Sequence, residues 1–248
     1  MTSYTFTNRA NIRIEAHLAK SNPELCEKYI YLHKKELKKI NVTNISSFDS
    51  SWINLHKCVI LIAKDLEENE KIVAGIRIEP WLGYNLLPLE KSLSEFSEVD
   101  CSEILKKEDI ENIAEVCGLW VSYNKPGLGR IITRAAFSIF PQLKIKKSIA
   151  LVSHLTLRTA SLMGYQCLRN YGNKGAFPYP NSEHKSYIMY HSNASSLEDA
   201  HQRERENIQE LNKKKILLRS EPKKNSRFLI QYRLNLESEI KRLSKSNF

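Results

Sequence analysis

Two strongly apolar segments rich in β-branched residues restrict the fold of this chain more than any other part of its sequence. They are KCVILIAKDL (57–66) and KIVAGIRIEPW (71–81), and the polar stretch EENE separates them. Such a pair is typical of an antiparallel hairpin, because β-branched residues favour strands and a short polar stretch favours a turn. Both segments are apolar enough to be central strands, so we expect a sheet built around this hairpin.

Strand-like and helix-like patterns alternate along the rest of the first 195 residues. NIRIEAHL (11–18) alternates apolar and polar residues, as a half-buried strand does, and a helix is expected from Ser21 to Asn41 with Pro23 in its first turn. Residues 86–112 predict one or two short helices. Further strands are expected at 113–122, 148–154, 165–172 and 186–192, and further helices at 130–140 and 155–164. The pattern predicts a mixed α/β fold.

The composition limits the functional classes. The 248 residues carry a net charge of +10, which favours an acidic partner such as nucleic acid, an anionic membrane, an acidic carrier protein or a phosphate-rich cofactor. The five cysteines are widely spaced without a CxxC pair, so neither a disulfide framework nor a metal site is indicated. The sequence shows neither a leader pattern nor a membrane-spanning run, so we expect a cytoplasmic protein whose oligomeric state the sequence leaves open.

The character of the sequence changes after residue 195. Residues 196–248 hold thirteen Lys and Arg against eight Asp and Glu, and Ser196 followed by acidic residues is typical of a helix start. We therefore expect one domain over residues 1–195 and a basic helical C-terminal extension over 196–248. Within the extension, Phe228 and Tyr232 interleave with basic residues, which suits nucleic-acid binding by phosphate contacts and base stacking. The alternative is a solvated charged surface.

The stretch WVSYNKPGLGR (120–130) joins an expected strand to an expected helix through two glycines. Such a junction presents unpaired backbone N–H groups and the positive end of the helix dipole, which together favour an anion. Gly127 and Gly129 allow a close backbone approach, and Lys125 and Arg130 add positive charge. The alternative is an ordinary strand-to-helix connection. The stretch matches neither the GxxxxGK[ST] phosphate loop nor the GxGxxG dinucleotide motif.

Residues 119–139, LWVSYNKPGLGRIITRAAFSI, resemble the central strand, the Q/R-x-x-G-x-G/A loop and the next helix of the GCN5-related N-acetyltransferase (GNAT) superfamily. Asn124 stands where that motif has Gln or Arg. The order of elements over residues 10–192 resembles the same fold, including Gly164-Tyr165 after the second helix. The resemblance implies a mixed, mostly antiparallel central sheet flanked by helices.

Within that superfamily, residues 48–90 resemble the branch of the acyl-homoserine-lactone synthases and N-acyl amino acid synthases. The resemblance rests on Phe48-Asp49, on the G-x-x-R-x-x-P-like stretch 75–80, on the leucine-rich insertion and on Glu115. Gly118 stands where an arginine is expected three residues after that glutamate. This departure puts homoserine-lactone synthesis itself in doubt.

The resemblance also implies roles for particular residues. The backbone around Val121 polarises the thioester carbonyl, and a pyrophosphate lies against loop amides. Those amides belong to Gly127, Leu128, Gly129 and Arg130. Ser153 is a second candidate catalytic residue, and it corresponds to a residue that contacts the cofactor. Arg77 corresponds to a group that binds an acceptor carboxylate, with a salt bridge to Glu115 or Asp49 as the alternative. Apart from the resemblance, Asp49 and Trp52 are further candidate substrate-binding residues, and Trp52 either lines an acyl tunnel or belongs to the core.

Glu115 is the candidate general base. A strand period of two places Glu115, Cys117, Leu119 and Val121 on one face, and a carboxylate on an apolar face has a raised pKa. The alternative is a carboxylate at a strand edge, in solvent or paired with Arg77. The residue where the family places a tyrosine acid is Ala160.

These expectations describe an N-acyltransferase that moves an acyl group from an acyl thioester to a primary amine without a metal. The co-substrate is acetyl-CoA or a longer acyl-CoA, with acyl carrier protein as the alternative donor, and the acceptor is a small amine or amino acid. The other hypotheses are an inactive scaffold with this fold and a nucleic-acid-binding protein that uses the basic extension.

Overall fold

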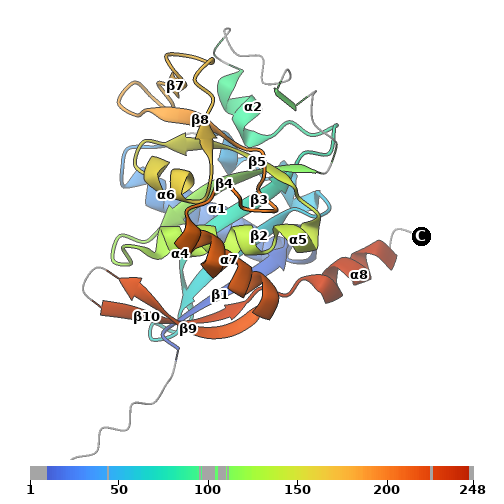
Figure 1. Ribbon diagram of the computed structural model, residues 1–248. Coiled ribbons are helices and arrows are strands. Elements are labelled where there is room, and N and C mark those ends of the chain that lie inside the picture. Colours follow the sequence, from blue (N-terminus) through green and yellow to red (C-terminus); the bar gives the residue numbers. More distant parts are fainter. Residues whose placement is uncertain are drawn as a thin grey trace, which may run out of the picture.

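The computed structural model of the chain describes residues 10–43, 45–94, 96, 104–105, 110, 112–223 and 226–245. Ten strands in these ranges form one sheet, in the order β6-β8-β5-β4-β3-β2-β1-β10-β9, and β7 pairs with β8 (Figure 1). Among the described strands, only β1–β10 and β4–β5 are parallel pairs. The strands are β1 (Ile12–Leu18), β2 (Val59–Asp65), β3 (Lys71–Pro80), β4 (Ile113–Val121), β5 (Lys147–Ser153), β6 (Gln166–Cys167), β7 (Ala176–Phe177), β8 (Ser186–His191), β9 (Ile216–Lys223) and β10 (Ser226–Arg233).

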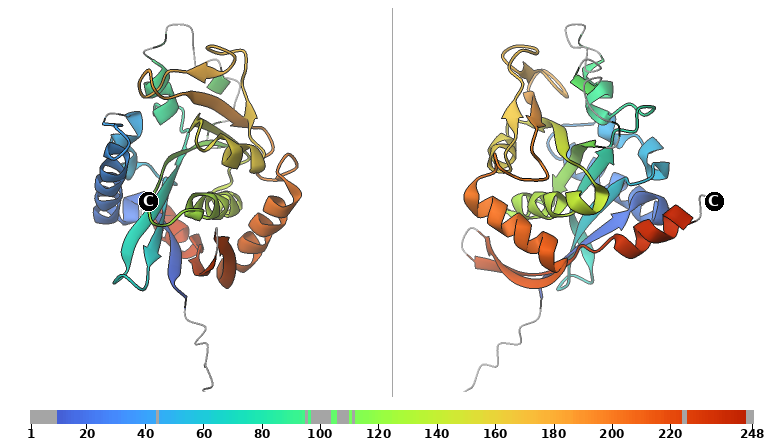
Figure 2. Two further views of the ribbon diagram at one scale, coloured as in Figure 1. Left: turned by 90° about the vertical axis from the view of Figure 1, so that its left-hand side faces the viewer. Right: turned by 45° about the vertical axis from the view of Figure 1, so that its right-hand side comes forward.

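Helices cover both faces of the sheet. The α-helices are α1 (Pro23–Lys38), α2 (Pro88–Leu93), α4 (Leu128–Ser138), α5 (Phe140–Leu143), α6 (Leu157–Leu162), α7 (Gln202–Lys214) and α8 (Glu237–Lys245). The 3-10 helices are η1 (Ala19–Ser21), η2 (Ser46–Phe48) and η3 (Ser51–Asn54). Figure 2 shows α1 and α4 on opposite sides of the central strands. No described helix is both long and apolar enough to cross a membrane.

Each face of the sheet has its own apolar core. Ile12, Ile14, Ala16 and Leu18 of β1 are buried at every second position and belong to the core beneath α4. On the other face, Tyr29 of α1 packs with Trp52 and Trp120. The central hairpin, β2 and β3, is buried along almost its whole length, which confirms the expectation from its β-branched residues.

Several boundaries differ from the sequence expectations. The first helix ends at Lys38 rather than at Asn41, and β6 covers only two residues of the expected strand 165–172. The expected helix start at Ser196 is wrong, because α7 begins at Gln202 after a run of turns. In the segment 86–112 the structure describes α2, while residues 95, 97–103, 106–109 and 111 lie outside the described residues.

The expected helical extension is wrong for residues 216–233, which form the hairpin β9–β10. Phe228, Ile230 and Tyr232 are buried at alternate positions, which is the period of a strand. Arg227 and Arg233 flank this stretch, and the many basic residues of the segment hide the pattern. β10 pairs in parallel with β1, so this hairpin continues the central sheet. The boundary near residue 195 stays a prediction.

The extension should therefore contribute to the stability of the whole fold. Phe228 is 2% exposed, and we expect Phe228→Ala to lower the free energy of unfolding by about 3–5 kcal/mol through the cavity it leaves. Leu218, on the paired strand, is 47% exposed, so Leu218→Ala should cost less than about 0.5 kcal/mol. Urea unfolding measures both values. Equal small effects would show that the hairpin does not pack on the core.

Candidate active site

A cavity of about 680 Å³ opens where β4 and β5 separate. The last pair between these two parallel strands is Glu115 with Ile149, and beyond it no residue of β4 pairs with β5. The cavity runs between the two sheet faces, from α4 and α6 on one side to the end of α1 and η2 on the other. Its lining includes Glu36, Leu37, Ile40, Glu115, Cys117, Val121, Gly129, Thr133, Val152, Ser153, Thr159, Ala160 and Tyr165.

A bulge in β4 accompanies this separation. Between the paired positions Gly75–Trp120 and Arg77–Cys117, β3 has one residue and β4 has two, Gly118 and Leu119. Gly118 adopts a φ of +61°, and a Cβ there would lie 2.3 Å from Tyr29 Oη. Only glycine fits this position without strain, so the departure from the family pattern at residue 118 has a local structural cause.

The bulge corrects the expected alternation of side chains along β4. Glu115 and Cys117 of β4 lie on one face of the sheet, as expected, and Arg77 and Glu79 of the neighbouring β3 lie on the same face. Leu119 and Val121 instead pack with the core beneath α4, and Trp120 takes the α1 side. Because of the extra residue, the odd-numbered side chains after Cys117 lie on the opposite face of the sheet from Glu115 and Cys117.

Glu115 lies in the wall of the cavity and is 2% exposed. Its Oε2 accepts a hydrogen bond of 2.8 Å from the backbone N–H of Leu89, and its other oxygen has no hydrogen-bond partner among the described residues. Burial raises the pKa of Glu115 to about 8, the facing Glu79 carboxylate adds to the shift, and Leu89 and Arg77 oppose it. A carboxyl group in this state can accept or donate a proton near neutral pH.

Glu79 and Arg77 complete a buried ionic group beside Glu115. Glu79 stands directly opposite Glu115 in the sheet, and burial raises its pKa as well. The Arg77 guanidinium lies 3.0 Å from Glu79 Oε2, donates to the carbonyl of Ser47 at 3.3 Å, and stacks 4.4 Å above the ring of Trp52. Two carboxyl groups thus share one guanidinium in a buried setting, which favours retention of one proton by the pair.

The glycine loop ends at Gly127, which precedes α4 with a φ of +89°. The amide of Leu128 donates to the carbonyl of Lys125 at 3.3 Å, whereas the amides of Gly127, Gly129 and Arg130 have no backbone acceptor among the described residues. No acidic residue lies in the first turn of α4. These free N–H groups and the helix dipole can bind an anion at the edge of the cavity.

The two cations predicted at this loop have intramolecular partners. Lys125 pairs with Asp65, and Arg130 Nε donates to Glu204 at 3.0 Å. Gly129 lines the main cavity, and a Cβ on it would lie 3.4 Å from Val121 Cγ2. The glycine therefore leaves room between β4 and α4.

The other predicted residues fall into two groups. Ser153 and Val121 line the cavity. The cavity lining does not include Trp52, Arg77 or Asp49. Trp52 and Arg77 are buried and stack on each other, and Asp49 pairs with Lys91. Their direct contact with an acceptor stays a prediction.

Tyr165 is buried in the wall of the cavity. Its hydroxyl lies 2.6 Å from Ser148 Oγ, and burial raises its pKa.

Sequence reasoning missed several contributors to the site. Glu79 received no role, although its place two residues after Arg77 puts it on the same face of β3. The N–H of Leu89 reaches Glu115 from the leucine-rich insertion, which no local pattern indicates. His33 lines the cavity, and burial lowers its pKa to about 3.

Comparisons with known proteins bear on the fold. No family model matches the sequence, and none of the curated proteins matches it. Solved structures do match. FeeM, an N-acyl amino acid synthase from uncultured soil microbes, matches with a TM-score of 0.57 at 10% identity, over 77% of this chain and 96% of FeeM. The chain has the GNAT fold.

Two further GNAT-fold structures match at similar levels. The CoA-dependent acyl-homoserine lactone synthase BjaI matches with a TM-score of 0.54 at 11% identity, over 83% of this chain and 90% of BjaI. An acyl-CoA N-acyltransferase from Pseudomonas aeruginosa matches with a TM-score of 0.50 at 9% identity, over 73% of this chain and 99% of that one. At such identities the GNAT likeness describes the fold alone, and it confirms the predicted fold class.

The buried carboxyl group should make stability depend on pH in a definite direction. The pKa of Glu115 rises from 4.5 to about 8 on folding, so its contribution to stability is complete below pH 4.5 and is lost as pH rises through 8. The free energy of unfolding of the wild type should therefore fall between pH 5 and pH 9 more than that of Glu115→Gln. Urea unfolding at both pH values measures this difference. Glu183→Gln, at an exposed position, is the matched control. Parallel pH dependence of wild type and Glu115→Gln would contradict the buried carboxyl group.

Proposed function

We propose that this protein is an N-acyltransferase that moves an acyl group from an acyl thioester to a primary amine by direct attack. The observation that carries the proposal is the position of Glu115 in the wall of a cavity that also borders the glycine loop. A base and an anion-binding loop on one cavity are what transfer from a phosphate-bearing thioester requires. The proteins whose structures match include an N-acyl amino acid synthase and a CoA-dependent synthase, which supports the same reaction class.

The donor would lie between the separated strands β4 and β5. Its pyrophosphate would accept hydrogen bonds from the amides of Gly127, Leu128, Gly129 and Arg130, and the α4 dipole would stabilise its charge. Its thioester would reach β4 near Val121, on the side of the strand that no longer pairs with β5, where an N–H group could polarise the carbonyl. Ser153 lies on the opposite wall, on β5. Acyl-CoA fits this description, and acyl carrier protein presents a similar phosphate-linked thioester.

The acyl group would occupy the apolar part of the cavity toward α1. Leu37, Ile40, Val42 and Ile45 line that end. The cavity volume of about 680 Å³ falls in the range of ordinary small-molecule sites, and this apolar end adds room beyond the part that the donor's arm would fill. We therefore propose a donor with a longer acyl chain, although acetyl-CoA stays an alternative co-substrate.

Glu115 would remove a proton from the acceptor ammonium group. The free amine then attacks the thioester carbon, the carbonyl oxygen takes the negative charge, and the attacking nitrogen carries two protons and a positive charge. Collapse of this intermediate expels the thiolate, and the nitrogen passes one proton to the thiolate, directly or through water, which leaves a neutral amide and a thiol. Glu115 releases the proton it took from the ammonium group to water and is again a carboxylate. Because the pKa of Glu115 lies near 8, the carboxylate form is present at neutral pH and still has appreciable basicity.

Two variants should separate donor binding from chemistry. Gly129→Val fills the space beside Val121, so it should weaken the binding of a long-chain acyl-CoA by about tenfold or more. Glu115→Gln should leave that binding within about threefold but lower the amine-dependent release of thiol by about a hundredfold. Calorimetry and a thiol-release assay with a panel of amines and amino acids measure the two effects. Unchanged donor binding by folded Gly129→Val, or full activity in Glu115→Gln, would contradict the proposal.

Glu79 would act as a positioning residue that tunes Glu115. Glu79→Gln removes a like charge opposite Glu115 and leaves Arg77 without its carboxylate partner, so the pKa of Glu115 should fall. The pH at which the transfer rate reaches half its maximum should move to lower pH, while Glu183→Gln should leave it in place. An unmoved pH profile in Glu79→Gln would remove this role.

The burial of Phe228 and Tyr232 weakens the nucleic-acid hypothesis. Both rings are at most 2% exposed, and the Tyr232 hydroxyl donates to Glu221 at 2.9 Å. Neither ring can stack on a base in this arrangement, so no observation of the fold favours that second function.

A further inference from the structure

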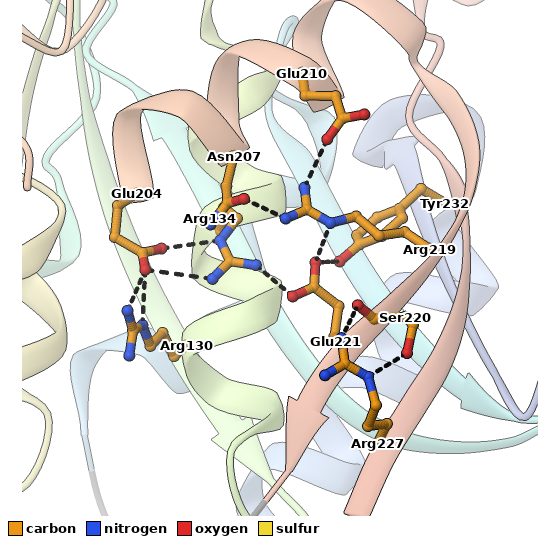
Figure 3. Close-up of polar contacts among 10 residues, drawn as sticks. All are labelled: Arg130, Arg134, Glu204, Asn207, Glu210, Arg219, Ser220, Glu221, Arg227 and Tyr232. Carbon is orange, nitrogen blue, oxygen red and sulfur yellow. Dashed lines mark hydrogen bonds and ion pairs between the residues drawn. The ribbon is translucent and has the colours of Figure 1, made fainter. Parts of the chain in front are cut away.

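A second cavity, of about 420 Å³, lies where α4, α7 and the β9–β10 hairpin meet. Its lining is rich in arginine, and Figure 3 shows how four of these side chains converge from the three elements. We call it the arginine cavity. The arginines that line it are Arg130, Arg134, Arg203, Arg219 and Arg227.

Buried carboxylates fix one side of this cavity. Glu204 of α7 and Glu221 of β9 are at most 1% exposed. Arg134 bridges them, with Nε 2.9 Å from Glu204 Oε2 and Nη1 2.7 Å from Glu221 Oε2. Its pKa is raised by these carboxylates, against the effect of burial, so it stays charged. This bridge holds the extension against α4 (Figure 3).

Two further arginines are also neutralised. Arg130 shares Glu204, and Arg219 pairs with Glu210 at 3.1 Å and with Glu221 at 3.3 Å. The pKa of Glu204 is lowered, against the effect of burial, mainly through its hydrogen bond with Arg134. Three of the five arginines therefore form ion pairs with three carboxylates, those of Glu204, Glu210 and Glu221.

The remaining two arginines stand at the rim without a carboxylate. Arg203 and Arg227 are exposed, and neither forms an ion pair within the described part of the chain. Arg227 is oriented by Ser220, whose carbonyl accepts from its Nη2 at 3.0 Å. Five guanidinium groups against three carboxylates leave an excess of positive charge on a concave surface. Such a surface attracts anions.

The arginine cavity also adjoins the glycine loop. Pro126 and Gly127 line it, whereas Gly129, two residues further on, lines the main cavity. The loop thus separates the two cavities. A ligand whose pyrophosphate lies on the loop amides could extend one end into each of them.

We propose that the arginine cavity binds a phosphate monoester, with Arg203 and Arg227 as its unneutralised ligands. Guanidinium groups bind phosphate through paired, charge-assisted hydrogen bonds, which suits a dianion better than a carboxylate. The phosphate can come from two sources. One is the 3′-phosphate on the adenosine end of a CoA thioester, which deepens the proposed function, and the other is a free nucleotide or inorganic phosphate.

The experiment compares four probes by calorimetry: CoA, dephospho-CoA, which lacks only the 3′-phosphate, adenosine 3′,5′-bisphosphate and inorganic phosphate. The variant is Arg203→Gln with Arg227→Gln, which removes two charges from exposed positions that hold no ion pair. Lys213→Gln with Lys146→Gln removes the same charge from exposed positions outside both cavities and is the matched control. Thermal unfolding checks that all proteins are folded.

With CoA as the source, the wild type should bind CoA about tenfold or more tightly than dephospho-CoA, and the double arginine variant should abolish that difference. Equal binding of CoA and dephospho-CoA, with arginine-dependent binding of the bisphosphate or of inorganic phosphate, would support the cavity with a free ligand as its source. Arginine-independent binding of every probe, or binding of none, would overturn the proposal. Transfer activity is also measured with dephospho-CoA thioesters. If these donors are used although the arginines do not affect the binding of any probe, the arginine-cavity proposal fails while the proposed function stands.

Discussion

The point at which β4 leaves β5 is the constraint on which the rest of the structure depends. An extra residue at Gly118 bends β4, and pairing with β5 ends at Glu115. Unpaired backbone groups are costly when they are buried away from water. Part of that cost is offset by the hydroxyl of Tyr29, which donates to the carbonyl of Gly118 at 2.5 Å. The separation creates the cavity, and it leaves Glu115 as the last paired residue at its wall.

Two buried ionic groups lie on opposite sides of the sheet and differ in their balance of charge. Beside β3, burial raises the pKa of both Glu115 and Glu79, and the repulsion between these two carboxyl groups adds to the shift of Glu115, which Arg77 only partly opposes. Between α4 and the extension, arginines outnumber their carboxylate partners. Buried ion pairs contribute little net stability but require defined geometry. In both places that geometry defines a site with an unbalanced charge.

Local patterns in the sequence predicted the central hairpin, the glycine loop and the position of Glu115, because each depends on residues close together in the chain. The bulge was not predictable, since a φ of +61° at Gly118 depends on how Tyr29 of a distant helix packs. The β9–β10 hairpin was missed because its alternating buried residues, Phe228, Ile230 and Tyr232, lie in a segment that is rich in Lys and Arg. Long-range partners such as Leu89 for Glu115 come only from the fold.

The most direct measurement of the central claim, that the separated strands bind an acyl thioester, is the affinity of the wild type for acyl-CoAs of increasing chain length. Each methylene buried in an apolar cavity contributes about 0.8 kcal/mol at most. The account predicts that affinity rises severalfold with successive methylenes and levels off once the cavity is full. Equal affinity for acetyl-CoA and long-chain acyl-CoA would contradict the acyl role of the cavity, and binding of neither would contradict the claim itself.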